Sequence, residues 1–528
     1  MIEPAELKPA VTISYNPANG EKIGETPVDT LDDLKDAINL ARKAQKTWAA
    51  KSYSERKKYL LKIRDYIVEN ADNLSEIISL DSGKTLVDAL STEVLPVTMA
   101  INYYAKNAGK LLKRHYIKPG NILLINKRAY VDRVPYGVIG IISPWNYPFA
   151  IPFHEIAMAL ITGNTVILKA ASQTQEVSKA ITRCVRAANL PEGVFTNLNL
   201  PGKLAGNGFV DLGVDKIFFT GSVEVGKQLM AKCAENLTPL SLELGGKDAM
   251  IVLEDADLDR AVAGALWAGF SNTGQSCAGV ERIFVQSSIY EKFSEKLKFE
   301  IKKLKFGSNK KFSSDIGTLT TESQLLKVRE HVNDAIEKGA SIFSANDNVG
   351  EKNGYSHAPV LVENVNNDML IQFEETFGPV LTLKKFEKVE EAIAEANNSN
   401  LGLTASIWTK NHSEGKNIAS KIQAGTVTIN DHLMSHGLAE TPWGGFKQSG
   451  PGRTHGYIGL EEMTQPQCIV NDILPGVKKN MWWYPHNQDV FNGLKDAMKF
   501  LYGKNLGEKA GAIPGLLKVF LRTFRKDN

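Results

Sequence analysis

The chain has 528 residues, of which 43% are hydrophobic and 23% charged, and its formal net charge is +3. This length and hydrophobic content support two or three domains with large cores. Four cysteines without close spacing argue against a disulfide framework and a cysteine-based zinc site, and we expect no metal site. The main body is nearly neutral, which argues against nucleic-acid binding.

The N-terminus shows neither the basic stretch nor the apolar run of a signal peptide. A run of 18 apolar residues, which would be needed to span a bilayer, occurs nowhere in the sequence. We therefore expect a cytoplasmic protein without a membrane-spanning helix.

The first part of the chain predicts a helical layer. Residues 16–20 have the composition of a turn between two short strands. Apolar residues then recur at helical spacing in four segments, residues 31–48, 54–70, 72–80 and 97–111. None of these segments carries a recognisable chemical motif.

From residue 137 the pattern changes to short apolar strands that alternate with helices. Strands are predicted at residues 138–142, 165–168, 194–198 and 216–219, each followed by a segment of helical spacing. Such alternation predicts a parallel, doubly wound α/β sheet. Ligands of these sheets bind beyond the carboxyl ends of the strands, where the loops carry Asn146, Lys169 and Ser222.

The nucleotide-binding signal in this sheet is weak. The glycine-rich dinucleotide fingerprint is absent, and Gly221-Ser222-Val223-Glu224-Val225-Gly226 stands between a strand and a helix instead. Backbone N–H groups at this helix start could face phosphate oxygens. Alternatively, Ser222 is only a helix cap.

A second α/β unit begins at Asp248. Its strands are predicted at residues 249–253, 282–285, 359–362, 380–386, 404–409 and 426–429. Its helices are predicted at residues 258–270, 290–304, 324–339, 389–397 and 415–422.

Within this unit, residues 272–277 form a small polar turn that ends in Cys277. A turn between regular elements suits a nucleophile that a substrate must reach. An ordinary cysteine is only a few per cent thiolate near neutral pH, so Cys277 needs a helper, and Glu243 is a candidate. The other cysteines lie in apolar surroundings and are interpreted as core residues: Cys184, Cys233 and Cys468.

Five motifs now stand in order along the chain: Pro144-Trp145-Asn146, Glu243-Leu244-Gly245-Gly246-Lys247, Gly274-Gln275-Ser276-Cys277, Glu375-Thr376-Phe377-Gly378-Pro379 and Pro442-Trp443-Gly444-Gly445. In this order they resemble the aldehyde dehydrogenase superfamily, of the NAD(P)-dependent, hydrolytic type. The resemblance covers roughly residues 10–475. It implies two doubly wound α/β domains with a small β oligomerisation arm, and a homodimer or homotetramer.

The same resemblance implies domain boundaries. Residues 10–116 and 136–245 would form the NAD(P)-binding domain, and residues 246–445 the catalytic domain. Residues 117–135 and 465–475 would form the arm, with one strand in 116–134 and another in 465–473. Residues 480–528 lie outside the resemblance.

By resemblance, Cys277 attacks the aldehyde carbonyl. The Asn146 amide and the Cys277 backbone N–H would stabilise the developing oxyanion. Glu243 would then activate the water that releases the acid from the thioester. In isolation, Asn146 would be interpreted as a turn cap and Glu243 as a surface carboxylate; the ordered set favours the catalytic interpretation.

The resemblance also implies contacts to NAD or NADP. Trp145 and Ser222, with Gly221 and Gly226, would lie at the pyrophosphate. Lys169 would contact the adenosine ribose, and Glu375 and Phe377 the nicotinamide riboside.

One departure from the family pattern concerns the adenosine end. This chain has Lys169-Ala170-Ala171-Ser172 where the family often carries an acid in the last position. A carboxylate there would repel a 2′-phosphate, whereas the Ser172 hydroxyl can donate to it. The sequence therefore predicts that NADP is accepted.

Several functions stay open at this point. The substrate could be a hydrophobic or aliphatic aldehyde, or succinic semialdehyde. A CoA-acylating enzyme typically lacks the general base, so Glu243 favours hydrolysis. A catalytically silent nucleotide-binding protein is disfavoured by the joint presence of Asn146, Glu243 and Cys277.

The C-terminal extension has an amphipathic composition. Met481-Trp482-Trp483-Tyr484-Pro485 opens it, and two apolar stripes at helical spacing follow. Residues 489–528 carry eight Lys or Arg against four Asp or Glu. A short basic amphipathic helix can lie on an anionic membrane. We expect a membrane contact, a cover for substrate access or a structural cover for the body.

Overall fold

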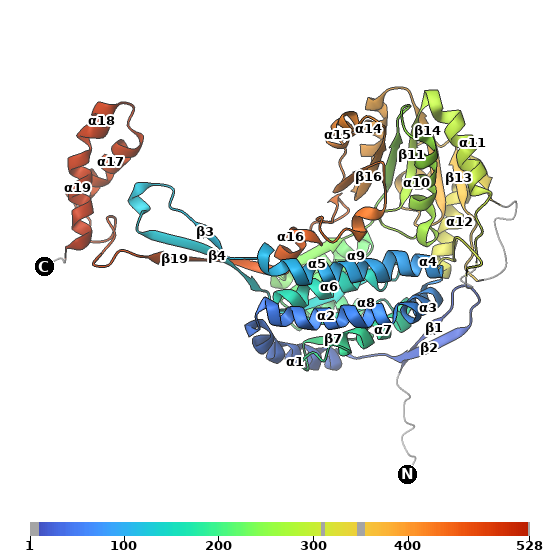
Figure 1. Cartoon of the computed structure of the whole chain (residues 1–528), viewed down its shortest axis with the longest axis horizontal. Helices are drawn as coiled ribbons and strands as arrows, with labels where there is room; N and C mark the ends of the chain where they lie inside the picture. Colours follow the sequence, from blue (N-terminus) through green and yellow to red (C-terminus); the bar gives the residue numbers. More distant parts are fainter. Residues whose placement is uncertain (1–9, 308–311, 346–353, 526–528) are drawn as a thin grey trace, which may run out of the picture. The chain divides into compact units, whose positions relative to one another are not determined.

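The computed structural model describes residues 10–307, 312–345 and 354–525, and its elements are shown in Figure 1. The chain divides into two compact units. The first unit runs to Lys113 and resumes with Arg133–Gln465, and the second combines Arg114–Asp132 with the chain from Pro466 onward. The domain boundary predicted near residue 245 lies inside the first unit and stays a prediction.

A hairpin and a helical layer open the first unit. Strands β1 (Val11–Tyr15) and β2 (Lys22–Pro27) pair antiparallel around the predicted turn. The long helices that follow are α1 (Leu31–Ala50), α2 (Tyr53–Glu69), α3 (Ala71–Ser82) and α5 (Leu95–Leu111). Capping boxes at Thr30 and Ser52 fix the starts of α1 and α2.

Between α3 and α5 lies a segment that the apolar pattern did not predict. It consists of helix α4 (Leu86–Ala89) and the π-helical turn η1 (Leu90–Val94). A π-turn adds one residue to the helical repeat and so shifts the spacing of the apolar residues. The helical periodicity of the sequence therefore did not predict this segment.

The first parallel sheet has five strands in the order β7-β6-β5-β8-β9. These are β5 (Val138–Ile142), β6 (Thr165–Lys169), β7 (Phe195–Asn197), β8 (Lys216–Thr220) and β9 (Leu240–Glu243). The crossover helices are α6 (Ala150–Thr162), α7 (Gln175–Arg186), α8 (Gly202–Asp211) and α9 (Val223–Asn236). Strand β9 was not predicted, and it places Glu243 at the carboxyl edge of this sheet.

Side chains from central strand β5 enter two different cores. Ile139 and Ile141 belong to one buried cluster, and Val138 and Ile142 belong to another. Helices therefore cover both faces of the sheet, as a doubly wound fold requires.

The second sheet has seven strands in the order β12-β13-β14-β11-β10-β16-β17. Its parallel strands are β10 (Asp248–Val252), β11 (Val280–Gln286), β13 (Val360–Glu363), β14 (Val380–Phe386), β16 (Thr404–Trp408) and β17 (Thr426–Ile429). The antiparallel edge strand β12 (Ser341–Ser344) was not predicted. The main helices are α10 (Leu258–Phe270), α11 (Tyr290–Ile301), α12 (Glu322–Glu337), α14 (Val389–Asn397) and α15 (His412–Ala419). The predicted fold class, two doubly wound parallel sheets, is confirmed.

The second unit contains a three-stranded sheet in the order β19-β4-β3. Its strands are β3 (His115–Ile117), β4 (Lys127–Pro135) and β19 (Thr464–Asp472). The expectation of a single strand over residues 116–134 was wrong, because the short helical turn Ile122–Leu124 separates two antiparallel strands.

Three helices complete the second unit: α17 (Gln488–Tyr502), α18 (Leu506–Gly511) and α19 (Ile513–Leu521). Helices α17 and α19 pack closely, and an added Cβ at Gly493 would lie 2.6 Å from Val519 Cβ. Among the residues that the structure describes, no helix is long and apolar enough to cross a membrane.

Candidate active site

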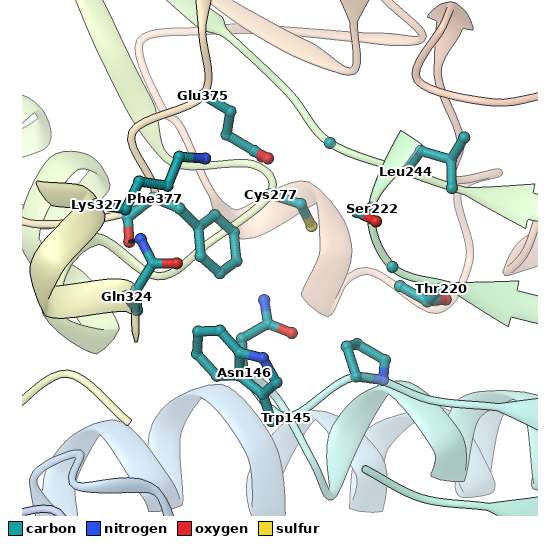
Figure 2. Close-up of a pocket in the computed structure, with 13 residues that line it drawn as sticks. Trp145, Asn146, Thr220, Ser222, Leu244, Cys277, Gln324, Lys327, Glu375 and Phe377 are labelled. Atoms are coloured by element: carbon teal, nitrogen blue, oxygen red, sulfur yellow. Dashed lines mark hydrogen bonds between the residues drawn. The ribbon is translucent and has the colours of Figure 1, made fainter. Parts of the chain in front are cut away.

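Loops at the ends of strands in the two sheets of the first unit bring most of the predicted residues, though not Glu243, to one pocket of about 270 Å³. Figure 2 shows Trp145, Asn146 and Ser222 from the first sheet facing Cys277, Glu375 and Phe377 from the second. In the first sheet these residues follow the carboxyl ends of β5 and β8, whereas Cys277, Glu375 and Phe377 lie in loops that precede β11 and β14 of the second sheet.

The turn before Cys277 has a strained backbone. Asn272 and Thr273 have φ angles of 51° and 56°, a left-handed conformation that is unusual for a β-branched residue. Hydrogen bonds hold it in place: Asn272 Nδ2 donates to the Gln275 carbonyl at 3.0 Å, and Gln275 Nε2 donates back to the Asn272 carbonyl at 3.1 Å. Gly274, with φ 71°, passes so close to Gly378 that a Cβ would clash with its carbonyl oxygen. Rigid surroundings therefore fix where the thiol points.

The environment of Cys277 favours the neutral thiol. Burial raises its pKa well above the ordinary value, and the nearby carboxylates of Glu375, Asp248 and Glu243 raise it further. In the unliganded protein the sulfur is therefore protonated at neutral pH, and its attack requires a base.

Asn146 lies next to the thiol and is 4% exposed. Its Nδ2 donates to the Gln275 carbonyl at 3.1 Å, which leaves the second amide hydrogen for another acceptor. Its backbone carbonyl accepts from Asn272 Nδ2 at 2.8 Å and from Lys84 Nζ at 2.9 Å. The Asn146 loop is thus tied directly to the cysteine turn.

Glu243 is 5% exposed at the end of β9. No described residue makes a hydrogen bond of normal geometry to its carboxylate oxygens, although the Trp443 indole lies near enough to favour ionisation. Burial raises its pKa well above the usual range, and Arg453 opposes this effect. A Cβ at Gly444 would lie 2.8 Å from Glu243 Oε1, so glycine there leaves room for the carboxylate.

The pocket wall opposite the thiol fits a dinucleotide. The rings of Trp145 and Phe377 meet edge to face at 5.7 Å, and they offer apolar surface. Glu375 Oε1 accepts from the Gly246 N–H at 2.9 Å, and burial raises the pKa of Glu375 to about 7. Ser222 caps α9 and lines the pocket, so the helix N-terminus can receive an anion.

A family model described as "Aldehyde dehydrogenase family" matches residues 6–469. The chain belongs to the aldehyde dehydrogenase family. It is 34% identical over 492 residues to a Methylomonas protein named "4,4'-diapolycopene aldehyde oxidase", covering 93% of this chain and 91% of that protein. It is 35% identical over 473 residues to a "Putative succinate-semialdehyde dehydrogenase [NADP(+)]" of Mycolicibacterium smegmatis, covering 88% of this chain and 90% of that protein.

A solved aldehyde dehydrogenase from Bacillus cereus in complex with NAD+ has a similar fold. The TM-score is 0.84 and the identity 32%, over 88% of this chain and 94% of that structure. The protein is accordingly an oxidoreductase that uses NAD or NADP.

Three predicted cofactor residues of this aldehyde dehydrogenase do not line the pocket. Lys169 ends β6 and Ser172 follows it, further along the same sheet edge, and burial lowers the pKa of Lys169 to about 8. Gly226 packs α9 against the sheet, since a Cβ there would lie 2.8 Å from Leu244 Cδ2. The structure therefore gives Gly226 a packing position, whereas the roles of Lys169 and Ser172 stay predictions.

A second pocket of about 360 Å³ in this aldehyde dehydrogenase also reaches Cys277. Apolar and aromatic side chains dominate its lining: Leu95, Pro96, Tyr147, Ile151, Trp267, Leu433 and Met434. Asp431 is the one charged residue among the described residues that line it. Apart from Cys277, no sequence motif marked this pocket, because its walls come from η1, α5, α6, α10 and loops that are far apart in the sequence.

Sequence reasoning also missed a buried ion pair behind Asn146. The side chains of Lys84 and Glu93 are both 0% exposed, and Lys84 Nζ lies 2.5 Å from Glu93 Oε1. Glu93 Oε2 accepts from the backbone N–H groups of Phe149 at 2.7 Å and Ala150 at 3.1 Å, where α6 begins. The pair therefore holds the loop at Asn146 and at the start of α6.

Asp88 in α4 supports the other side of the site. Its carboxylate accepts from Ser271 Oγ at 3.1 Å and from the Asn272 N–H at 3.3 Å, next to the cysteine turn. On the cofactor side, Gln324 Nε2 in α12 donates to the carbonyls of Thr376 at 2.9 Å and Phe377 at 3.0 Å. A single charged or amide residue in a helical segment gives no indication in the sequence that its side chain holds a distant loop.

Proposed function

We propose that the protein oxidises an uncharged, apolar aldehyde to its carboxylic acid with NAD or NADP. The apolar pocket beside Cys277 is the observation that carries this proposal. Its lining offers dispersion contacts to a hydrocarbon chain, and Asp431 offers no counterion to an anionic substrate.

In the proposed reaction, the Cys277 thiol gives its proton to solvent water, the thiolate attacks the aldehyde carbon, and the carbonyl oxygen becomes an oxyanion. The Asn146 amide and the Cys277 N–H stabilise this charge, a contribution of about 2.7–4 kcal/mol for each donor in comparable sites. Bound NAD or NADP supplies the hydride acceptor that allows the thiohemiacetal to become a thioester. Glu243 then takes a proton from the water that attacks the thioester, and the Cys277 thiolate leaves.

Cofactor binding in this proposal uses the residues of the first pocket. Glu375 and Phe377 would contact the nicotinamide riboside, and Trp145 and Ser222 the phosphates; all four line this pocket together with Cys277. Lys169, with Ser172, would hold the adenosine ribose and accept the 2′-phosphate of NADP.

Succinic semialdehyde is the main competing substrate, because a relative carries that activity in its name. The Asp431 carboxylate would repel its carboxylate, and among the described residues no Lys or Arg lines the pocket to compensate. The buried Glu243 likewise favours water over CoA as the acyl acceptor.

A chain-length panel separates these possibilities. NAD(P)H formation would be followed at 340 nm with propanal, octanal, decanal and succinic semialdehyde, each with and without CoA. We expect kcat/KM to rise with chain length, without dependence on CoA. A preference for succinic semialdehyde over octanal would contradict the proposal.

We further propose a homodimer or homotetramer that assembles through β19. This strand is an edge of its sheet, and Ile469 and Val470 on it are exposed. An exposed apolar edge strand can pair with a second copy. Light scattering of the wild type and of Val470→Lys tests this, and an unchanged mass in the variant would contradict it.

Finally, we propose that the C-terminal extension lies reversibly on an anionic membrane in a cytoplasmic enzyme. The packing of α17 on α19 uses Gly493 and Val519, which leaves Phe491, Leu517 and Leu521 exposed. Basic side chains accompany them: Lys495, Lys499, Lys518, Arg522 and Arg525. Such a composition suits an interfacial helix.

Sedimentation with phosphatidylserine vesicles tests the membrane proposal. We expect binding that Leu517→Ser/Leu521→Ser weakens and that high salt abolishes. Equal recovery of both proteins with the vesicles, or no binding by the wild type, would contradict it.

A further inference from the structure

A small chamber adjoins Cys277 in addition to the two pockets. Its volume is about 20 Å³, enough for one water molecule. Its lining includes the carboxylates of Glu155 and Glu243 and the imidazoles of His154, His436 and His455. Such a concentration of titratable groups is unusual in a protein interior.

Many polar atoms around this chamber have no hydrogen-bond partner among the described residues. These atoms are both carboxylate oxygens of Glu243, both ring nitrogens of His154, Glu155 Oε2 and His455 Nε2. The four side chains are only 1–5% exposed. Each buried polar group without a hydrogen-bond partner destabilises the fold by roughly 1–3 kcal/mol. Such a group is therefore explained either by a bound water molecule or by a functional role.

The three imidazoles form a continuous group. Ring centroids lie 4.1 Å apart for His154 and His455, 5.0 Å for His436 and His455, and 5.5 Å for His154 and His436. His436 also lines the apolar substrate pocket. The cluster therefore extends from the chamber of Glu243 to the pocket that the substrate enters.

We propose that Glu155, His154, His455 and His436 carry the proton of the deacylation step from Glu243 to the substrate pocket. This inference rests on the proposed hydrolytic function. Without such a route the proton would stay on Glu243, which is buried, and the base could not act in the next turnover.

The proton balance is simple. Water forms a C–O bond with the thioester, the C–S bond breaks, and one water proton moves to Glu243. The chamber water passes that proton on, and each imidazole accepts a proton at one nitrogen while releasing another from its second nitrogen. For His455, whose Nδ1 bonds Thr454 Oγ1, the second exchange is with that hydroxyl. One proton per turnover leaves through the relay, and no group in the relay is oxidised or reduced.

The resting charges of the cluster agree with this role. Burial lowers the pKa of His436 to about 4 and holds the pKa values of His154 and His455 well below the usual range. A neutral imidazole has one donor and one acceptor nitrogen, as a relay needs. Burial raises the pKa of Glu155 to about 8.

Other groups that face the cluster are Arg453, Tyr104 and Tyr147. Arg453 favours the ionised form of Glu243, whereas the charge of Glu155 opposes it. The Tyr104 ring meets His154 edge-on at 6.4 Å, and the Tyr147 ring stacks on His436 at 6.5 Å. Thr454 Oγ1 lies 2.8 Å from His455 Nδ1, which leaves the Nε2 of His455 toward the cluster.

The test compares acylation with deacylation in Glu155→Gln and His154→Gln, with octanal as the probe. Rapid mixing gives the NAD(P)H burst, steady-state assays give turnover, and mass spectrometry of quenched samples detects the acyl-enzyme. We expect burst rates within about twofold of the wild type and turnover lowered at least tenfold, with acyl-enzyme accumulating. The solvent isotope effect on turnover should rise, and its pH profile should lose the step that Glu155 contributes.

His357→Gln is the matched control, because His357 is also 1% exposed and bonds the Ala358 carbonyl away from the chamber. Turnover of Glu155→Gln equal to the wild type, or burst and turnover reduced together, would overturn the relay. Glu155→Gln is isosteric and decides the matter even if His154→Gln fails to fold. A wild type that forms no NAD(P)H with any aldehyde would instead refute the proposed function.

Discussion

Lys84→Met tests whether the buried pair with Glu93 holds the Asn146 loop. The substitution keeps most of the side-chain volume but leaves the Glu93 carboxylate, 0% exposed, without its cation. Removing one partner of a buried pair destabilises a protein by about 3–5 kcal/mol. If the predicted NAD(P)-binding domain, of about 200 residues, unfolds as one unit, this corresponds to a fall in Tm of roughly 6–20 °C.

The double variant Lys84→Met/Glu93→Gln supplies the decisive comparison. It removes both charges, while the amide oxygen introduced at position 93 can still accept from the start of α6, so we expect it to recover more than half of the lost Tm. Lys303→Met is the surface control, because Lys303 and Glu300 are 54% and 31% exposed and such pairs contribute about 0–1 kcal/mol.

Calorimetry gives the Tm values, and steady-state kinetics give the catalytic effect. Since Lys84 donates to the Asn146 carbonyl, we expect kcat of the single variant to fall about tenfold below the wild type, a fraction of the effect of losing an oxyanion donor. A Tm for Lys84→Met no lower than that for Lys303→Met would refute the reasoning.

The remaining predictions concern the reacting groups and the cofactor. Cys277→Ser should lose turnover but still bind NADP by calorimetric titration; near-normal activity would exclude the proposed nucleophile. Glu243→Gln should keep a burst of NAD(P)H and then turn over slowly, whereas joint loss of both phases would assign Glu243 to thiol activation. Asn146→Ala should lower kcat about 10²–10³-fold, and an unchanged kcat would remove it from the oxyanion site. Because burial raises the pKa values of Cys277 and Glu243, both are protonated at low pH, and burst and turnover rates should rise from pH 6 to 9; a falling rate would contradict this. NADP should be used at least comparably to NAD, and Ser172→Glu should shift the preference toward NAD; a hundredfold wild-type preference for NAD would refute this.

The sequence predicted those parts of the site that depend on local pattern. The loop with Asn146 follows a strand with a clear apolar pattern, so its place at the sheet edge could be inferred, and the turn with Cys277 could be placed between a helix and a strand. Strand β9 was missed because Leu240–Glu243 alternates apolar and polar residues and lacks the continuous apolar run of its neighbours. It becomes a strand through pairing with β8.

Polar contacts between residues that are far apart in the sequence could not be predicted either. Glu93 contacts Phe149 across 56 positions, and Asp88 contacts Ser271 across 183 positions. A charged residue in a helical segment normally indicates an exposed face, so a single sequence gives no reason to bury Lys84 and Glu93 together. The histidine cluster was missed for the same reason, since His154, His436 and His455 come together only in the folded chain.

Among the described residues, Cys277 alone is common to the linings of the two pockets and the chamber. In the proposed function, nucleotide, aldehyde and water would therefore approach one sulfur atom by separate routes, and none would block the route of another. Kinetically, an unreactive analogue of the aldehyde should not compete with the nucleotide for its site. Inhibition by such an analogue should accordingly be noncompetitive toward NAD or NADP and competitive toward the aldehyde.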